Sequence, residues 1–204
     1  MFIVLEGIDG AGTTTQTERL VAHLDRRGRR AVATREPSDG PVGRLLRDIL
    51  LGRHAVPGGA PMGGATMALL FAADRLDHLQ REVEPQLASG GDVVSDRYLL
   101  SSLAYQAEET DRAWVASLAR GVRPPDLTVL VDVPLEVAAA RRARAGRPLE
   151  RYDADSYLAK VAENYRTLAR AEARTVVVDG AGSPDEVARA IAQEVDRHLR
   201  EARS

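Results

Sequence analysis

With 204 residues, the chain is long enough for one domain with a sizeable core, or for one domain with a small lid. Its net charge of −2 argues against a general nucleic-acid-binding protein, which would normally be basic. Cysteine is absent, which excludes disulfides, thiolate metal ligands and a cysteine nucleophile.

Neither the histidines nor the apolar runs predict a metal centre or a membrane span. The four histidines lack the spacing of metal ligands, and we interpret them as surface residues: His23, His54, His78 and His198. The longest apolar stretch, residues 65–73, is too short to cross a bilayer, and no signal peptide is recognised before the first predicted strand. We therefore expect a soluble, cytoplasmic protein.

Short apolar runs alternate with longer segments of helical periodicity. Four of the five runs are rich in Val or Ile, as expected for strands that are covered on both faces. The predicted strands are residues 2–6, 30–34, 92–95, 127–132 and 175–178. The predicted helices are residues 14–27, 41–51, 64–88, 98–120 with a break near 110–111, 134–144, 154–172 and 183–201. This alternation predicts an α/β fold with a five-stranded parallel sheet, helices on both faces, and a single domain over residues 1–204.

Two segments rich in glycine, proline or arginine are predicted to be loops. Residues 52–64 contain five glycines and two prolines and are interpreted as a flexible loop, not a domain linker. Residues 141–151 contain five arginines between two predicted helices. This second segment, about 141–152, is a candidate mobile lid.

The residues between the first strand and the first helix nearly match the phosphate-binding P-loop pattern G-x-x-x-x-G-K-[ST]. Gly7 and Gly12 have the required spacing, and Thr14 supplies the hydroxyl that binds Mg²⁺. Thr13 stands where the pattern has a lysine that reaches the β- and γ-phosphates. The strand before the loop and the helix after it are the context that the pattern requires, since the helix N-terminus adds positive charge. The alternative is a glycine-rich turn that binds no ligand.

Each predicted strand ends in polar residues, at the edge of the sheet where ligands bind in such folds. They are Glu6, Arg35-Glu36, Asp96-Arg97, Asp132 and Asp179-Gly180.

Together with the P-loop, several further segments resemble the thymidylate kinase family. The matching segments are EGIDGAGTTTQ (6–16), TREP (34–37), LLFAADRLDH (69–78), SDRY (95–98), SSLAYQ (101–106), RPPDLTVLVDVP (123–134) and ERYDADSYLAKVAENY (150–165). They are collinear over nearly the whole chain. The resemblance implies a P-loop kinase fold, transfer of the γ-phosphoryl group of ATP to dTMP, Mg²⁺ as cofactor and a homodimer. Neither nucleic acid nor a membrane is an expected partner.

Elementary chemistry agrees with these residue types. The phosphate of a nucleoside monophosphate is already ionised at neutral pH, so the acceptor needs little help from a general base. The difficulty is to bring anionic phosphates together and to stabilise the charge on the transferring group. A site rich in arginine, with one or two carboxylates, meets that need.

The resemblance assigns residues to ATP, to Mg²⁺ and to catalysis. The ATP-binding residues that it implies are Gly7, Gly10, Ala11, Gly12, Thr13, Thr14, Thr15 and Gly180. The metal would be held by Thr14 and Asp96. The catalytic residues would be Asp9, Arg97, Arg147 and Arg151. Arg97, Arg147 or Arg151 would have to supply the charge that Thr13 lacks. Arg141, Arg142 and Arg144 fit a phosphate-binding role and a solvated helix end equally well.

The dTMP-binding residues that the resemblance implies are Asp9, Glu36, Phe71, Arg75, Arg97, Ser102, Tyr105 and Gln106. Phe71 would stack on the thymine ring, although helical periodicity alone favours core packing for it. Tyr105 would lie under the deoxyribose and disfavour a 2′-hydroxyl.

Two other functions remain open. The chain is alternatively a kinase of another nucleotide or nucleoside. It is also compatible with a non-catalytic nucleotide-binding protein that kept the fold and lost turnover together with the P-loop lysine.

Overall fold

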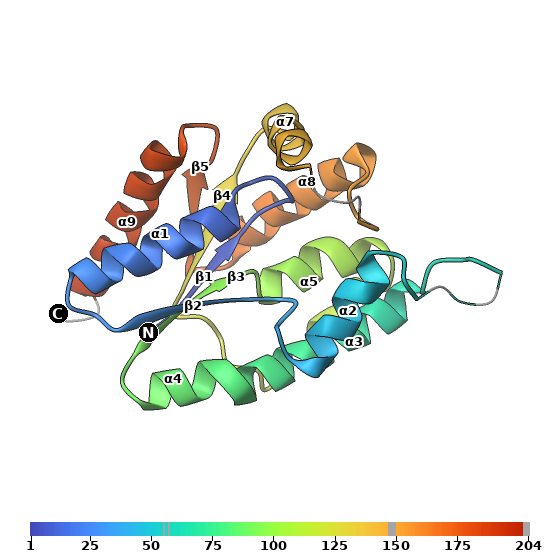
Figure 1. Ribbon diagram of the computed structural model, residues 1–204, viewed down its shortest axis with the longest axis horizontal. Helices are drawn as coiled ribbons and strands as arrows, with labels where there is room; N and C mark the ends of the chain where they lie inside the picture. The colour runs from blue at the N-terminus through green and yellow to red at the C-terminus, as the bar shows by residue number, and fades with distance from the viewer. Residues whose placement is uncertain (55, 57, 147–149, 202–204) are drawn as a thin grey trace.

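The computed structural model describes residues 1–54, 56, 58–146 and 150–201. In this part of the chain five strands form one parallel sheet in the order β2-β3-β1-β4-β5 (Figure 1). The strands are β1 (Phe2–Glu6), β2 (Ala31–Arg35), β3 (Asp92–Asp96), β4 (Leu127–Asp132) and β5 (Thr175–Asp179). The predicted parallel α/β architecture is confirmed, and each strand boundary lies within one residue of its prediction.

Helices lie on both sides of this sheet. The α-helices are α1 (Thr13–Arg26), α2 (Pro41–Leu50), α3 (Gly64–His78), α4 (Glu84–Ala88), α5 (Leu99–Tyr105), α6 (Arg112–Ser117), α7 (Leu135–Ala145), α8 (Asp155–Ala171) and α9 (Pro184–Glu201). Figure 1 shows α1 and α9 on one side of the strands and α5 and α8 on the other. No helix in the described part of the chain is long and apolar enough to cross a membrane.

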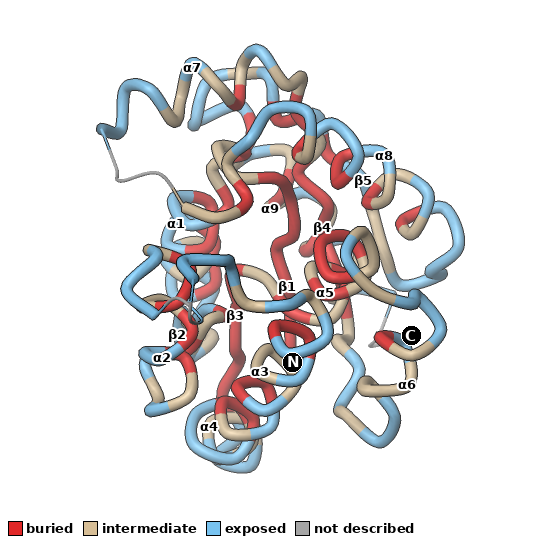
Figure 2. The backbone as a smooth tube through the Cα atoms, turned by 90° about the vertical axis from the view of Figure 1, so that its right-hand side faces the viewer, coloured by how far each residue is buried: buried red, intermediate tan, exposed pale blue. Residues whose placement is uncertain are grey.

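The central strand β1 is buried on both faces. Its alternate side chains enter two separate core clusters: Ile3 and Leu5 belong to the larger one, and Phe2 and Val4 to the smaller one. This division follows from the two-residue period of a strand. Figure 2 shows the buried backbone concentrated in the middle of the molecule, along the central strands. The P-loop therefore starts from a strand that is buried along its whole length.

Coverage on both faces, which we predicted for the Val-rich strands, is wrong for the two edge strands. Val32 in β2 is 38% exposed and Val177 in β5 is 55% exposed. A strand at the edge of a sheet has a neighbouring strand on one side only, so its side chains are less completely covered than those of a central strand. Valine content reflects the preference of β-branched residues for strands as well as burial, so it could not separate edge strands from central ones.

The long predicted helix 64–88 is interrupted. A π-helical turn, Leu79–Val83, lies between α3 and α4. The break predicted near 110–111 is confirmed, because a 3₁₀ turn (Gln106–Glu108) follows α5 and α6 begins only at Arg112. Asp111 caps α6 by accepting a hydrogen bond of 2.7 Å from the Trp114 backbone N–H.

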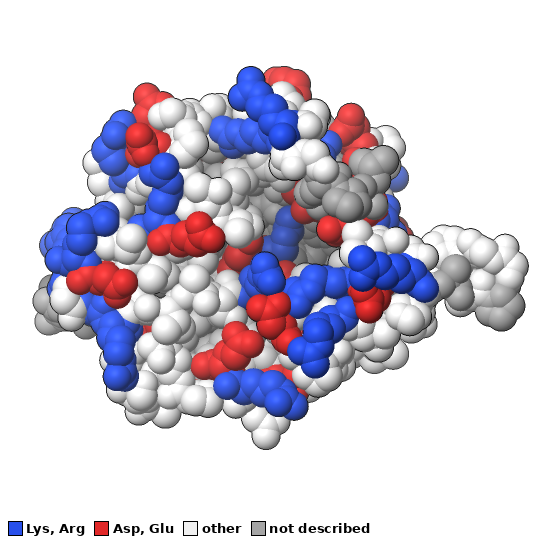
Figure 3. Space-filling view, viewed as in Figure 1, with Lys and Arg blue, Asp and Glu red and all other residues white. Residues whose placement is uncertain are grey.

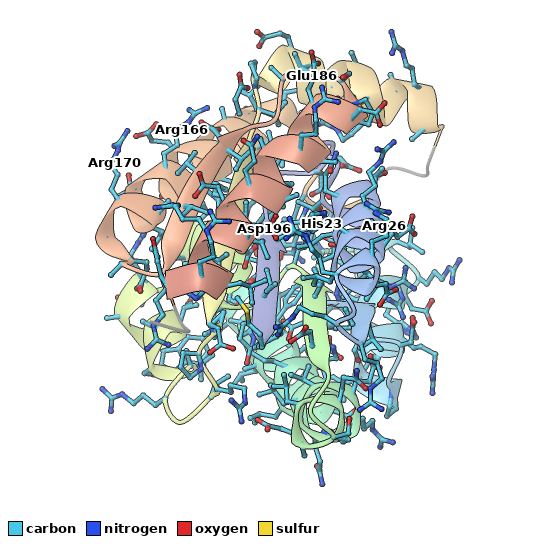
Figure 4. All side chains as sticks on the ribbon, turned by 90° about the vertical axis from the view of Figure 1, so that its left-hand side faces the viewer. His23, Arg26, Arg166, Arg170, Glu186 and Asp196 are labelled. Atoms are coloured by element: carbon cyan, nitrogen blue, oxygen red, sulfur yellow. The ribbon has the colours of Figure 1, made fainter. Side chains whose placement is uncertain are left out.

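We predicted that all four histidines lie on the surface. This prediction is wrong for His78, whose side chain is fully buried. It contacts the Thr34 hydroxyl at 2.7 Å and the Glu36 carboxylate at 3.3 Å. His23 is half-buried, and Figure 4 shows it beside Asp196, at 3.1 Å, where α1 packs against α9. The face of the helix on which a histidine lies determines whether it is buried. The spacing between histidines, on which we based the prediction, does not.

Candidate functional site

The P-loop connects β1 directly to the N-terminus of α1. Helix α1 has no acidic residue in its first turn and no side-chain cap, and Gly12 occupies its N-cap position. The first N–H groups of a helix have no partner within the helix, and they carry partial positive charge. The loop and the helix end therefore offer N–H donors to an anion rather than to a capping side chain.

Gly10 and Gly12 are required by the backbone of this loop. Both have φ of 92°, in the left-handed region that favours glycine. A Cβ at Gly10 would also lie 2.4 Å from the carbonyl oxygen of Ala138 in α7. The glycine thus permits close contact between the P-loop and α7, whose C-terminal part contains the first residues of the predicted lid.

Thr14 and Asp96 lie together below the loop. The Thr14 hydroxyl donates to Asp96 Oδ2 at 2.5 Å, while Asp96 Oδ1 is buried without a hydrogen-bond partner among the described residues. No group of three or more His, Cys, Asp or Glu side chains in the described part of the chain forms a protein cage for a metal. One carboxylate and one hydroxyl beside a phosphate site fit Mg²⁺, which keeps several water and phosphate ligands.

A cavity of about 920 Å³ lies over the P-loop. Figure 3 shows this face of the molecule hollowed near its centre, with arginine and acidic side chains around the hollow. The P-loop forms its floor, and Arg141, Arg142, Arg144 and residues 181–184 contribute to its walls. Its volume lies within the range of nucleotide-sized ligand sites.

Two of the arginines whose role the sequence left open contact the P-loop itself. Arg142 donates to the Asp9 carbonyl at 2.8 Å, and Arg141 donates to the Ala11 carbonyl at 3.2 Å. Arg141 also donates to Gly180 O and Gly182 O, both at 2.9 Å. These bonds hold the end of α7 over the cavity, which argues against a solvated helix end.

Asp9 and Arg97 lie where this cavity meets a second, smaller one. Arg97 Nη2 donates to Asp9 Oδ1 at 3.1 Å, and the Tyr105 hydroxyl donates to Asp9 Oδ2 at 3.0 Å. The guanidinium also lies over the Tyr105 ring, 5.2 Å from its centroid. Burial raises the pKa of Tyr105 well above its ordinary value, so the phenol remains a neutral donor.

The second cavity, of about 70 Å³, has an aromatic wall. Phe71, Tyr105 and Tyr152 line it together with Gln106, and Asp9 and Arg97 line both cavities. Phe71 is half-buried and packs against the main core as well. The structure therefore gives Phe71 both positions that the sequence suggested: it contacts the core and it borders a cavity.

Glu36, Arg75 and Ser102 form a buried network beside the smaller cavity. Arg75 Nη2 donates to Glu36 at 3.1 Å and to the Ser102 hydroxyl at 2.8 Å. Together they connect the segment after β2 with α3 and α5. The structure brings these three predicted residues together, although none of them lines either cavity.

Arg151 lies on the side of the smaller cavity. It pairs with Glu109 at 2.9 Å, and it donates to the Met62 carbonyl. It lines neither cavity. Of the predicted ATP-binding residues, Gly10, Ala11, Gly12, Thr13, Thr14 and Thr15 line the cavity over the P-loop, whereas Gly7 and Gly180 do not. Arg147, the other predicted lid arginine, lies outside the described residues.

Tyr152 and Tyr165 are site residues that the sequence did not single out. Tyr152 lines the smaller cavity, and the Tyr165 hydroxyl contacts Arg97 at 3.3 Å. Both lie in or next to α8. The segment 150–165 resembles the family as a whole, but the resemblance assigned no role to its individual tyrosines. A lone tyrosine in an amphipathic helix carries no signal that distinguishes a site residue from a core residue.

The contact between Gly10 and α7 yields a testable prediction. Gly10→Ala should lower the free energy of unfolding by more than about 2 kcal/mol, because left-handed strain of about 1–2 kcal/mol adds to steric overlap with Ala138. Gly58→Ala is the matched control, since Gly58 also has positive φ (89°) but open space around its Cβ. The measurement is urea denaturation of both variants. Equal losses would show that the contact with α7 contributes nothing.

Comparison with known proteins agrees with this geometry. Residues 5–191 match the sequence profile of thymidylate kinase. The chain is 42% identical over 202 residues to a probable thymidylate kinase of Pyrobaculum aerophilum, covering 98% of both chains. It is 43% identical over 173 residues to a probable thymidylate kinase of Thermococcus kodakarensis, covering 83% of this chain and 84% of the relative. It is 40% identical over 207 residues to a thymidylate kinase of Synechococcus sp., covering 97% and 95%. The chain belongs to the thymidylate kinase family.

Proposed function

We propose that this protein transfers the γ-phosphoryl group of ATP to dTMP, giving dTDP and ADP, in the cytoplasm. The observation that carries the proposal is that Asp9 and Arg97 line both cavities. One cavity has a P-loop floor and nucleotide size, and the other has aromatic walls. A charged pair at their junction is suited to phosphates that approach each other from two sides.

The residues of the chain suggest how the reaction is supported. The P-loop N–H groups bind the donor phosphates, and Thr14 with Asp96 would hold Mg²⁺, which supplies charge neutralisation of the phosphates when bound. Arg97 binds the acceptor phosphate, for which a guanidinium fork is suited. Burial alone would lower the pKa of Arg97, but charge interactions, including that with the Asp9 carboxylate, raise the pKa well above the ordinary value. Arg97 therefore remains charged.

Acceptor profiling tests the proposal. Purified protein with ATP and Mg²⁺ should form a diphosphate from dTMP much faster than from dUMP, CMP or GMP, measured by coupled ADP release. Faster reaction with another acceptor would show that this nucleotide, and not dTMP, is the substrate. Tight nucleotide binding without any dTDP would support the non-catalytic alternative, which Thr13 keeps open.

Phe71 provides the most specific test of the acceptor site. Phe71→Ala should raise the dissociation constant for dTMP by about tenfold to a hundredfold, since a base–aromatic stack contributes roughly 1–3 kcal/mol. Binding of an ATP analogue should change little, because Phe71 does not line the larger cavity. Calorimetry with each ligand separates the two effects. Equal losses for both ligands would indicate a displaced α3 instead of a lost stack.

We also propose that arginines replace the charge of the lysine that Thr13 lacks. Arg142 and Arg141 already contact the P-loop, whereas Arg151 would have to leave Glu109 to reach it. Participation of Arg151, expected from the sequence, remains a prediction alongside these two.

A double-mutant cycle identifies the arginine that supplies this charge. Arg142→Ala should reduce kcat by about tenfold or more, because a charged hydrogen bond contributes about 1.5–3 kcal/mol. The loss should be smaller in the Thr13→Lys background. The same cycle with Arg151→Ala tests that residue, and a coupling energy larger than that of Arg142 would assign the role to Arg151. Additive effects in both cycles would contradict compensation by either residue.

An exposed apolar stripe on α3 supports a homodimer. Leu69 and Leu76, seven residues apart, are 51% and 58% exposed, and Ala65 and Ala73 on the same side are also exposed. Exposed leucines in a row on one helix are typical of an interaction surface. Sedimentation equilibrium should give twice the 22.1 kDa of one chain. The mass of a single chain at micromolar concentration would contradict the dimer.

A further inference from the structure

Glu6, the last residue of β1, is a fully buried carboxylate with four hydrogen-bond donors around it. Its Oε1 accepts from the backbone N–H groups of Tyr98 and Ser101, at 3.0 and 3.2 Å. Its Oε2 accepts from the hydroxyls of Ser101 and Tyr165, at 2.6 and 3.0 Å. The residue precedes the P-loop but does not line the cavity above it. The functions discussed so far give it no role.

The donors to Glu6 surround the backbone of Arg97. Arg97 has φ of 74° and is the one non-glycine residue with positive φ in the described part of the chain. Its own N–H donates to the Leu5 carbonyl at 2.8 Å, and the next N–H, that of Tyr98, donates to Glu6. A left-handed conformation of this kind persists only where its surroundings fix it. Two consecutive residues of β1 fix it here.

The same hydroxyls that donate to Glu6 also contact the guanidinium of Arg97. Arg97 Nη1 lies 3.4 Å from the Ser101 hydroxyl oxygen and 3.3 Å from that of Tyr165. A hydroxyl has one proton to donate. The two hydroxyl oxygens also lie 2.8 Å from each other. When Ser101 and Tyr165 both direct their protons to the carboxylate, the lone pairs of their oxygens face Arg97.

The charge of Glu6 matters for this arrangement. Burial raises the pKa of the Glu6 carboxyl, while hydrogen bonds from Ser101 and the charge of Arg97 act in the opposite direction. Four donors on two oxygens satisfy an ionised carboxylate. The neutral amide of a glutamine at position 6 would place its NH₂ group, which can only donate, against either the two backbone N–H donors or the two donating hydroxyls.

We propose that Glu6 is a positioning residue for Arg97, which fixes both the backbone turn and the hydroxyls that direct the guanidinium toward Asp9. The proposal rests on the assignment of Arg97 to the acceptor phosphate. It predicts that loss of Glu6 impairs acceptor binding selectively. Loss of a purely structural residue would lower stability and affect both substrates equally.

Glu6→Gln should raise KM for dTMP by about tenfold, the effect of one misplaced charged hydrogen bond. KM for ATP should change by less than about threefold on the same scale. The matched control is Asp92→Asn, another buried carboxylate, which binds Arg29 and the N-terminus at the opposite end of the sheet. It should lower thermal stability without changing the ratio of the two KM values. Parallel changes in both KM values for Glu6→Gln would overturn the proposal.

Two further variants keep the test decisive if Glu6→Gln folds poorly. Tyr165→Phe removes one hydroxyl between Glu6 and Arg97 and leaves the backbone bonds intact, so it should also raise KM for dTMP selectively. An unchanged KM would contradict the role of the hydroxyls. In the Arg97→Ala background, Glu6→Gln and Tyr165→Phe should have no further effect on dTMP, and additive effects would refute positioning through Arg97. If Arg97→Ala alone leaves KM for dTMP unchanged, then Arg97 does not bind the acceptor phosphate. If Arg97→Ala raises this KM but Glu6→Gln does not, only the positioning role of Glu6 is wrong.

Discussion

The contact between Arg97 and Asp9 joins the two halves of the site. Asp9 belongs to the P-loop, which β1 and α1 hold, and Arg97 belongs to the turn after β3. Because β1 and β3 are adjacent parallel strands, both segments leave the sheet at the same edge. The 3.1 Å contact between the two side chains therefore places a carboxylate and a guanidinium where the larger and smaller cavities meet. The arrangement of both cavities depends on this pair, and the burial of β1 on both faces keeps it in place.

Positive charge reaches the site from three parts of the chain. Arg97 comes from the sheet edge and Arg141 and Arg142 come from α7, while Arg75 from α3 is paired with Glu36 beside the smaller cavity. Each guanidinium is held by several acceptors, so little conformational entropy remains to be lost when phosphates bind. Distributed fixed charges of this kind are compatible with a P-loop in which position 13 is threonine. Phosphoryl transfer responds to the summed electrostatics of the site, and not to one particular lysine.

Local patterns in the sequence predicted those features of the structure that depend on residues close together in the chain. Strand positions and the P-loop follow from short periodicities and local motifs, and the rule that parallel strands end at one edge places the polar residues after them. The grouping of Asp96 with Thr14 was implied by the family resemblance. What depends on distant packing was not predictable. The burial of His78, the exposure of Val177 and the pairing of Arg151 with Glu109 each depend on elements far apart in the chain. Tyr165 was missed for the same reason, because its role arises only where α8 crosses α5.

A crystal structure with a bisubstrate analogue, adenosine and thymidine joined by a phosphate chain, tests the account most directly. We expect the adenosine end beside residues 181–184, the thymine ring on Phe71, and the phosphate nearest thymidine within hydrogen-bond distance of Arg97, below about 3.2 Å. Thymidine outside the smaller cavity, with no contact between Arg97 and the phosphate chain, would contradict this arrangement.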